Sequence, residues 1–166
     1  MEKKENYEST PKGFLKTISI IHLGLFAGPL IFGIFTFSTI KETKIDYSDT
    51  NDIFLFLVPL FAISGILVGN ILFKEQIDKL INKDSLMEKL SGFQTASIIK
   101  YALLEGPALI GIVAFNNNGN LLYLIISGIL ILYLIILRPT NDIIETSLNF
   151  TIEQQNQFNQ KEQIIR

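Results

Sequence analysis

The chain has 166 residues, of which 48% are hydrophobic and 18% charged, and a formal net charge of −2 at pH 7. It contains no cysteine and one histidine, which excludes disulfides and thiolate metal sites and removes most zinc and haem arrangements. A net charge of −2 indicates no basic surface of the kind that binds nucleic acid. We therefore expect no cofactor, no metal and no nucleic-acid partner.

The charged residues are segregated along the chain. Four apolar runs together contain only two of the 30 charged residues, Lys100 and Glu105. Each run is long enough, as an α-helix, to cross about 30 Å of hydrocarbon. The runs are residues 17–40, 53–73, 97–115 and 121–137. The pattern predicts an all-α integral membrane protein, a four-helix bundle with the lipid bilayer as its surroundings.

The distribution of lysine and arginine predicts how the chain is oriented. Most of the 14 basic residues lie in residues 1–16, 74–100 and 138–166, and the other two are Lys41 and Lys44. The positive-inside rule therefore places both termini and the central loop in the cytoplasm. On this interpretation residues 1–16 and 138–166 are cytoplasmic tails of a membrane domain that covers residues 17–137.

Two segments outside the apolar runs also have predicted structure. In the cytoplasmic loop, residues 74–96, apolar positions recur at helical spacing, which predicts an amphipathic continuation of the second helix that breaks near Ser91-Gly92. Such a segment would bind a partner, or lie on the headgroups or on its own bundle. In the C-terminal tail, Thr151 and Gln154 have the spacing of a capping box, which predicts a short, frayed helix.

The two halves of the membrane region resemble each other. With two spans in each half, both units would enter the membrane from the same side, so the similarity predicts two parallel-repeat helical hairpins. Chance alignment of apolar segments is the alternative. The aligned pairs are Gly28-Pro29 with Gly106-Pro107, Gly33 with Gly111, and Ser64-Gly65 with Ser127-Gly128.

Small residues and prolines recur within the runs. Helices associate in lipid through close approach at glycine and alanine, so these residues predict packing within the bundle or an interface with another chain. A proline removes a backbone donor, which predicts a bent helix. The small residues are Gly24, Gly28, Gly33, Gly65, Gly69, Ala102, Gly106 and Gly111, and the prolines are Pro29, Pro59 and Pro107.

Glu105 lies near the middle of the third run. An ionised carboxylate there costs about 2.5–3.5 kcal/mol, so it should face the interior, be protonated or be paired. His22 lies at a similar depth in the first run, and Tyr101 is four residues before Glu105 on the same helix face. The three residues predict either a proton or cation site, or a buried polar pair that fixes the register of the helices.

Residues 105–115 resemble the ion-binding helix of rotary ATPase c subunits. In both, a membrane carboxylate is followed six residues later by a glycine and then by an apolar run of valine, alanine and phenylalanine. The resemblance implies that Glu105 carries a proton or a sodium ion. In this chain, however, the carboxylate is on the first helix of its hairpin, and the glycine-rich helix of that family is absent.

As a whole, the chain resembles uncharacterised small four-span bacterial inner-membrane proteins, in tracts such as residues 101–107 and 137–140. The resemblance implies a multi-pass protein of the bacterial inner membrane and no particular activity. We therefore predict a structural, assembly or accessory protein without catalytic residues, which forms a homo-oligomer or binds a membrane-protein partner. The alternative is a proton or cation translocating protein that uses Glu105 with His22.

Overall fold

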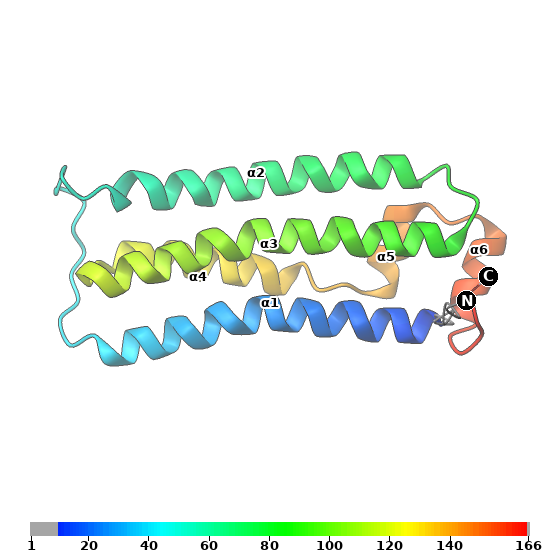
Figure 1. Ribbon diagram of the computed structural model, residues 1–166, viewed down its shortest axis with the longest axis horizontal. Coiled ribbons are helices and arrows are strands. Elements are labelled where there is room, and N and C mark those ends of the chain that lie inside the picture. The colour runs from blue at the N-terminus through cyan, green and yellow to red at the C-terminus, as the bar shows by residue number, and fades with distance from the viewer. Residues whose placement is uncertain (1–9, 166) are drawn as a thin grey trace, which may run out of the picture.

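A computed structural model describes residues 10–165 of the protein, and its regular secondary structure is helical (Figure 1). Four helices run lengthwise along the molecule and two short helices follow them. Figure 1 places the start of the first helix and the last two helices at one end, here called the terminal end, and the loop between the first two helices at the opposite end. The helices are α1 (Pro11–Thr39), α2 (Phe54–Leu80), α3 (Leu86–Asn118), α4 (Leu121–Ile136), α5 (Asn141–Leu148) and α6 (Ile152–Asn159).

Three of these helices, α1, α2 and α3, are each long and apolar enough to cross a membrane. The fourth apolar run forms α4, which has 16 residues and is therefore about 24 Å long at 1.5 Å per residue. It reaches membrane-spanning length only together with α5, and the two helices are bent by 81° from each other. The predicted all-α chain with membrane-length apolar helices is thus confirmed, with three or four such helices.

The loop between α2 and α3 differs from its predicted form. Helix α2 continues beyond its apolar run to Leu80, as expected, but the chain breaks before Ser85, whose side chain caps α3 by accepting a hydrogen bond from the backbone N–H of Glu88. The predicted break near Ser91-Gly92 is wrong, because α3 continues through it. A Cβ on Gly92 would lie 2.5 Å from a methyl carbon of Leu80, so this glycine permits close helix contact.

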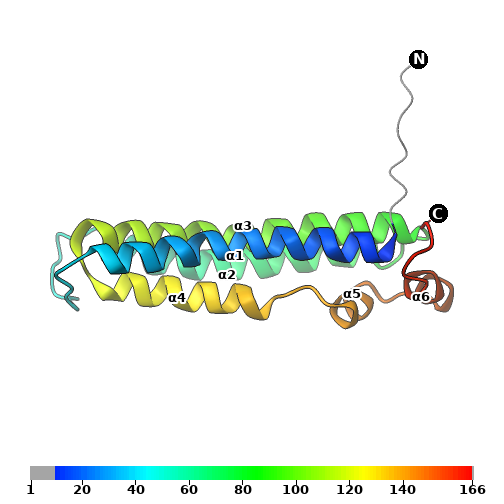
Figure 2. The same cartoon turned by 90° about the horizontal axis from the view of Figure 1, so that it is seen from below.

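Helix α3 is the centre of the arrangement. It lies between α1 and α2 in Figure 1, and α4 packs along it beneath the layer that these three helices form in Figure 2. Helices α1 and α2 therefore contact α3 from opposite sides, although they are consecutive in the chain. Each of the other long helices has α3 as its main neighbour.

Two glycines allow the closest contacts with α3. A Cβ on Gly65 of α2 would overlap the backbone oxygen of Leu103, and a Cβ on Gly111 of α3 would overlap the hydroxyl of Ser127 on α4. At Gly65 the overlapping atom is part of a backbone and cannot rotate away, whereas at Gly111 the hydroxyl can rotate and the backbone oxygen of Tyr123 lies 3.0 Å from the added Cβ. The other predicted packing residues that lie in ordinary contact with a neighbouring helix are Gly33 and Gly69.

The remaining predicted packing residues have no close contact with a neighbouring helix within the described chain. A Cβ built on Gly24, Gly28 or Gly106 would have no atom of residues 10–165 within 4 Å, other than those of its own local helix, and Ala102 is exposed. These four residues form the matched small-x-x-x-small tracts of α1 and α3. The structure leaves them open for contacts outside the chain.

The three prolines are accommodated within continuous helices. Helix α1 continues on both sides of Pro29, α2 on both sides of Pro59, and α3 on both sides of Pro107. A proline inside a helix leaves the carbonyl four residues earlier without its usual donor. The bends expected at these positions stay predictions.

The C-terminal segment forms part of a hydrophobic core at the terminal end. The predicted capping box of Thr151 and Gln154 is confirmed at the start of α6. The expected fraying stays a prediction, and the segment packs against the ends of the long helices through Phe158 and Ile165. The residues of this core are Phe14, Ile18, Ile77, Leu86, Leu90, Phe93, Ala96, Ile144, Leu148, Phe158 and Ile165.

Lys89 fastens this segment to α3. Its side chain is only 1% exposed, and Nζ donates hydrogen bonds to the backbone oxygen of Leu148 at 3.1 Å and to Oε1 of Gln154 at 3.0 Å. The amide of Gln154 in turn donates to the backbone oxygen of Asp84 at 2.8 Å. Because buried polar groups need partners, these bonds hold the start of α3 and the loop before α6 together.

Replacing Gly65 with alanine should destabilise the protein. The added methyl group would meet the backbone oxygen of Leu103, which cannot rotate away, so we expect the free energy of unfolding to fall by about 1–3 kcal/mol. Unfolding of the purified protein in detergent measures this change. The matched control is Gly128→Ala on α4, where a Cβ would meet nothing within 4 Å and no loss is expected. Equal losses in both variants would contradict the close contact.

Candidate functional site

His22 is buried where α1 meets α3 and α4. Its side chain is 3% exposed, and Nε2 lies 2.7 Å from the backbone oxygen of Leu134. Since a carbonyl oxygen only accepts, Nε2 carries the proton of this bond. The imidazole ring also packs against the rings of Tyr101 and Phe26, with centroid distances of 4.9 Å and 5.3 Å. The histidine is therefore a hydrogen-bond donor held in place by aromatic contacts.

Tyr101 donates a second hydrogen bond to the same end of α4. Its hydroxyl lies 3.0 Å from the backbone oxygen of Leu137, the residue that caps the helix. The last carbonyls of a helix lack the usual donor four residues later, and Pro139 removes one further N–H from this region. The oxygen of Leu134 also accepts from the backbone N–H of Leu137 at 3.1 Å, so His22 adds a second donor to it. His22 and Tyr101, from two other helices, thus supply donors to the C-terminal end of α4.

Glu105 does not join this pair. It is half-buried, and within residues 10–165 its carboxylate takes part in no hydrogen bond and no ion pair. No contact joins Glu105 to His22 within residues 10–165, and the Nε2 atom of His22 is bonded to the backbone oxygen of Leu134 instead. The structure therefore brings together His22 and Tyr101 and leaves the third predicted site residue apart.

The sequence does not reveal the role of the α4 carbonyls, because backbone oxygens have no signature of their own in a sequence. The bounds of α4 itself, Leu121–Ile136, agree with the fourth apolar run to within one residue. The available signal was Pro139, two residues after the fourth apolar run, because the residue before a proline avoids the helical conformation. A histidine and a tyrosine at matching depths in other runs were then candidate donors.

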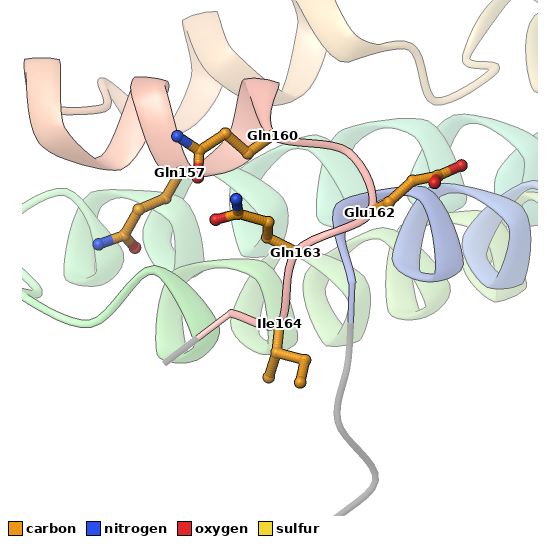
Figure 3. A pocket seen from close by; sticks show the side chains of 5 residues that line it. All are labelled: Gln157, Gln160, Glu162, Gln163 and Ile164. Atoms are coloured by element: carbon orange, nitrogen blue, oxygen red, sulfur yellow. The ribbon is translucent and has the colours of Figure 1, made fainter.

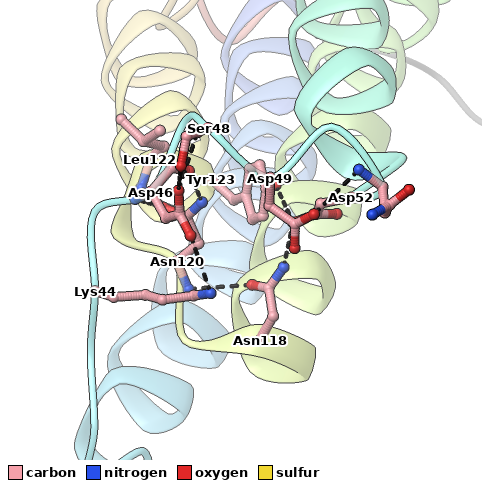
Figure 4. Close-up of polar contacts among 10 residues, drawn as sticks. Lys44, Asp46, Ser48, Asp49, Asp52, Asn118, Asn120, Leu122 and Tyr123 are labelled. Atoms are coloured by element: carbon pink, nitrogen blue, oxygen red, sulfur yellow. Dashed lines mark hydrogen bonds and ion pairs between the residues drawn. The ribbon is translucent and has the colours of Figure 1, made fainter.

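A polar network joins the two loops at the opposite end of the molecule (Figure 4). The backbone N–H of Lys44 donates to the oxygen of Gly119 at 3.0 Å, and the N–H of Leu121 donates to the oxygen of Lys44 at 2.9 Å. Gly119 has φ of 69°, a left-handed conformation that favours glycine. The side-chain amide of Asn120 donates to the backbone oxygen of Asp46. The α1–α2 loop is thus bound to the α3–α4 turn.

The acidic side chains of this network are used locally. Asp52 accepts hydrogen bonds from the hydroxyl of Tyr123 at 2.6 Å and from the side-chain amide of Asn118 at 2.5 Å (Figure 4). Hydrogen bonds from the backbone N–H and the hydroxyl of Ser48 lower the pKa of Asp46, which keeps this carboxyl ionised. The acids therefore fasten loops, and no cluster of three metal-ligating residues occurs within residues 10–165.

A hollow of about 480 Å³ lies beside the C-terminal segment (Figure 3). Figure 3 shows the amides of Gln157, Gln160 and Gln163 on one side and Glu162 turned away from them. The carboxylate of Glu162 is paired with the ammonium of Lys12 at 2.8 Å, and both side chains are exposed. The polar lining of this hollow therefore consists of neutral amides and a paired carboxylate, which do not form a set of catalytic groups.

Comparison with protein-family models, with curated proteins and with solved structures finds no significant match to this chain. The resemblances described above therefore rest on the sequence tracts themselves. The functional candidates are the capped end of α4, the unpaired carboxyl of Glu105 and the open small residues of α1 and α3.

Removing either donor should loosen the end of α4. In His22→Phe and Tyr101→Phe the aromatic contacts remain while one hydrogen bond to a buried carbonyl is lost, so we expect each variant to lose about 0.5–1.5 kcal/mol of stability. Hydrogen exchange at the amides of residues 135–138 should accelerate in both. Tyr47→Phe, in the exposed α1–α2 loop, is the control. Unchanged exchange in both donor variants would rule out the capping role.

Proposed function

We propose that the protein is a membrane-embedded bundle of four helices with a structural, assembly or accessory role, which presents an open helix face to a partner helix in the membrane. It has no enzymatic activity in this proposal. The observation that carries it is the outward face of α3, where small residues without neighbours flank an unpaired carboxyl. The partner is a second copy of the chain or another membrane protein.

The outward face of α3 follows from helical spacing. Ala102, Glu105, Gly106 and Leu109 lie three or four residues apart and so share one side of the helix. Ala102 is exposed, and Gly106 has no neighbouring helix within 4 Å of its Cβ position. A helix from another chain can approach closely at these two residues, as membrane helices do at small residues.

Glu105 supports this interpretation because its carboxyl has no partner among the described residues. A carboxyl at this depth in a membrane is costly unless a donor or a cation reaches it. A partner helix with a hydroxyl, amide or basic side chain at this level would remove that cost. Gly24 and Gly28 on α1 offer a second open approach of the same kind.

We also infer the membrane topology of the chain and an internal repeat of two helical hairpins. With both termini in the cytoplasm of a bacterial cell and the protein in its inner membrane, the basic residues lie on the side that the positive-inside rule requires.

The repeat of two hairpins is supported by Ser64 and Ser127, which lie at matched positions. The hydroxyl of each donates a hydrogen bond to the carbonyl four residues earlier, at 2.6 Å and 2.9 Å respectively. It is also supported by Gly28 and Gly106, which are both open.

A second candidate function is proton or cation translocation at Glu105. It is favoured by the same unpaired carboxyl, which has no hydrogen-bond partner within residues 10–165 that would hold it in one protonation state. His22 would not share this site, since its donor is bound to Leu134. In this alternative Glu105→Gln abolishes proton flux into vesicles that contain the purified protein.

The orientation predicts which introduced cysteines react from outside the cell. The chain has no native cysteine, so single-cysteine variants are unambiguous. We expect Asn117→Cys, in the α3–α4 turn, to react with an impermeant maleimide in intact cells, and Asp84→Cys, in the α2–α3 loop, to react only after lysis. The reverse pattern would overturn the topology.

The open face predicts a selective effect of bulky residues. Gly106→Leu should reduce the partner recovered in mild detergent, or the oligomer seen on native gels, by at least severalfold while the unfolding temperature is retained. Gly128→Leu, at an equally open glycine on α4, is the matched control and should leave assembly unchanged.

Two results would count against this function. Assembly that is equal in wild type, Gly106→Leu and Gly128→Leu would remove the open face as an interface. Proton flux that Glu105→Gln abolishes, without any change in assembly, would favour the translocating alternative.

A further inference from the structure

A hollow of about 410 Å³ lies on the flank of α1 near the end of α4. It is separate from the open face of α3 on which the proposed function depends. Its lining combines two basic residues and a hydroxyl with an apolar wall. The basic, hydroxyl and apolar residues of this lining are Lys16, Ser19, Ile20, Leu23, Phe26 and Arg138.

The polarity of the lining changes along α1. Lys16 and Ser19 lie nearest the terminal end, and Leu23 and Phe26 lie deeper in the apolar run, so that Lys16 and Phe26 are about 15 Å apart along the axis. Lys16 directly precedes the first apolar run, and Arg138 directly follows the fourth. The polar part of the hollow is therefore at the membrane boundary, and the apolar part is within the hydrocarbon.

The hollow exists because α4 is short. Helix α4 ends at Ile136 with a turn at Leu137, and a non-helical connection then runs on to α5, as Figure 2 shows, so this stretch of α1 lacks the cover of a full-length helix. The same turn brings Arg138 to the side of α1 that carries Lys16. Two cations, one on α1 and one in the connection between α4 and α5, thus line one opening.

Neither cation has a partner within residues 10–165. The ion pairs of the described chain involve Lys12, Lys44 and Lys83, and the side chains of Lys16 and Arg138 donate no hydrogen bond there. Two like charges at one opening repel each other, and an anion between them would relieve the repulsion. Arginine, lysine and a serine hydroxyl are donors that suit a phosphate group.

We propose that this hollow binds one anionic phospholipid, with its headgroup phosphate at Lys16, Ser19 and Arg138 and an acyl chain along Ile20, Leu23 and Phe26. Basic pockets between membrane helices at the bilayer boundary bind acidic headgroups in this way. A lipid satisfies both halves of the lining at once, whereas a free phosphate ion would leave the apolar wall uncovered.

The position of the lipid gives it a structural effect. His22 also lines the hollow, and its ring holds the donor that caps Leu134. A lipid against this wall would exclude water from the capped end of α4. Anionic lipid should therefore raise the unfolding temperature of the protein as well as bind to it.

The test is lipid binding by the full chain in detergent, measured by native mass spectrometry and by thermal unfolding. Phosphatidylglycerol, phosphatidylcholine and inorganic phosphate are the three probes. We expect tight binding and thermal stabilisation with phosphatidylglycerol alone. Lys16→Gln and Arg138→Gln should each weaken its binding about fivefold, and the double variant about 25-fold.

Two controls separate this site from general attraction of a basic surface. Lys74→Gln changes an exposed lysine at the same end of α2 and should leave binding unchanged. Lys16→Arg keeps the charge and should retain binding, which shows that loss in Lys16→Gln does not come from misfolding.

Three outcomes would overturn the proposal. Equal binding of phosphatidylcholine would show that the headgroup charge is not recognised. Displacement of the lipid by millimolar phosphate would assign the site to a free anion. Unchanged binding in the double variant would place the lipid elsewhere. Because the assay needs no partner protein, its failure is distinguishable from failure of the proposed function.

Discussion

The close contacts of α3 with α2 and α4 are the constraint on which the arrangement of the long helices depends. At Gly65 and Gly111 the added volume of a single Cβ would overlap an atom of the facing helix, a backbone oxygen in one case and a hydroxyl in the other. Because hydrocarbon offers no hydrophobic drive between helices, such contacts supply much of the attraction through dispersion. With α2 and α4 set against α3 in this way, α1 occupies a third side.

The position of α3 also explains why small residues of the same sequence type have different roles. Gly65 and Gly111 lie in close contact with neighbouring helices, whereas a Cβ on Gly106 would have no neighbour within 4 Å, although Gly106 and Gly111 are on one helix only five residues apart. A helix with neighbours on three sides still has a fourth, and on α3 that side carries Glu105. The unpaired carboxyl and the open glycine are therefore two properties of one uncovered face.

Much of the fold follows from the sequence because its signals are local. Apolar runs free of charge predict membrane-length helices, and the spacing of Thr151 and Gln154 predicts a cap that the structure contains. Gly92 shows where local reasoning fails. A glycine inside a helical pattern signals either a break or a close approach, and only the position of Leu80 on another helix decides between them.

The candidate site was less predictable for the same reason. His22 and Tyr101 are recognisable as polar residues in apolar surroundings, but their acceptors are backbone oxygens of α4, which no side-chain pattern reveals. The end of α4 at Ile136 agrees with the end of the fourth apolar run, but the hollow also needs Arg138 to lie beside Lys16 of α1. That placement is a property of tertiary structure, so periodicity in the sequence does not contain it.

The contact of α1 and α2 with opposite sides of α3 has a consequence for the order of assembly during synthesis. These two helices are made first, yet the surface that they share is on a helix made later. They must remain in the bilayer without their main neighbour until α3 is inserted between them. The bond between Lys44 and Gly119 forms later still, when the α3–α4 turn reaches the loop that joins α1 to α2. The first loop is therefore fixed only after the third helix has been made.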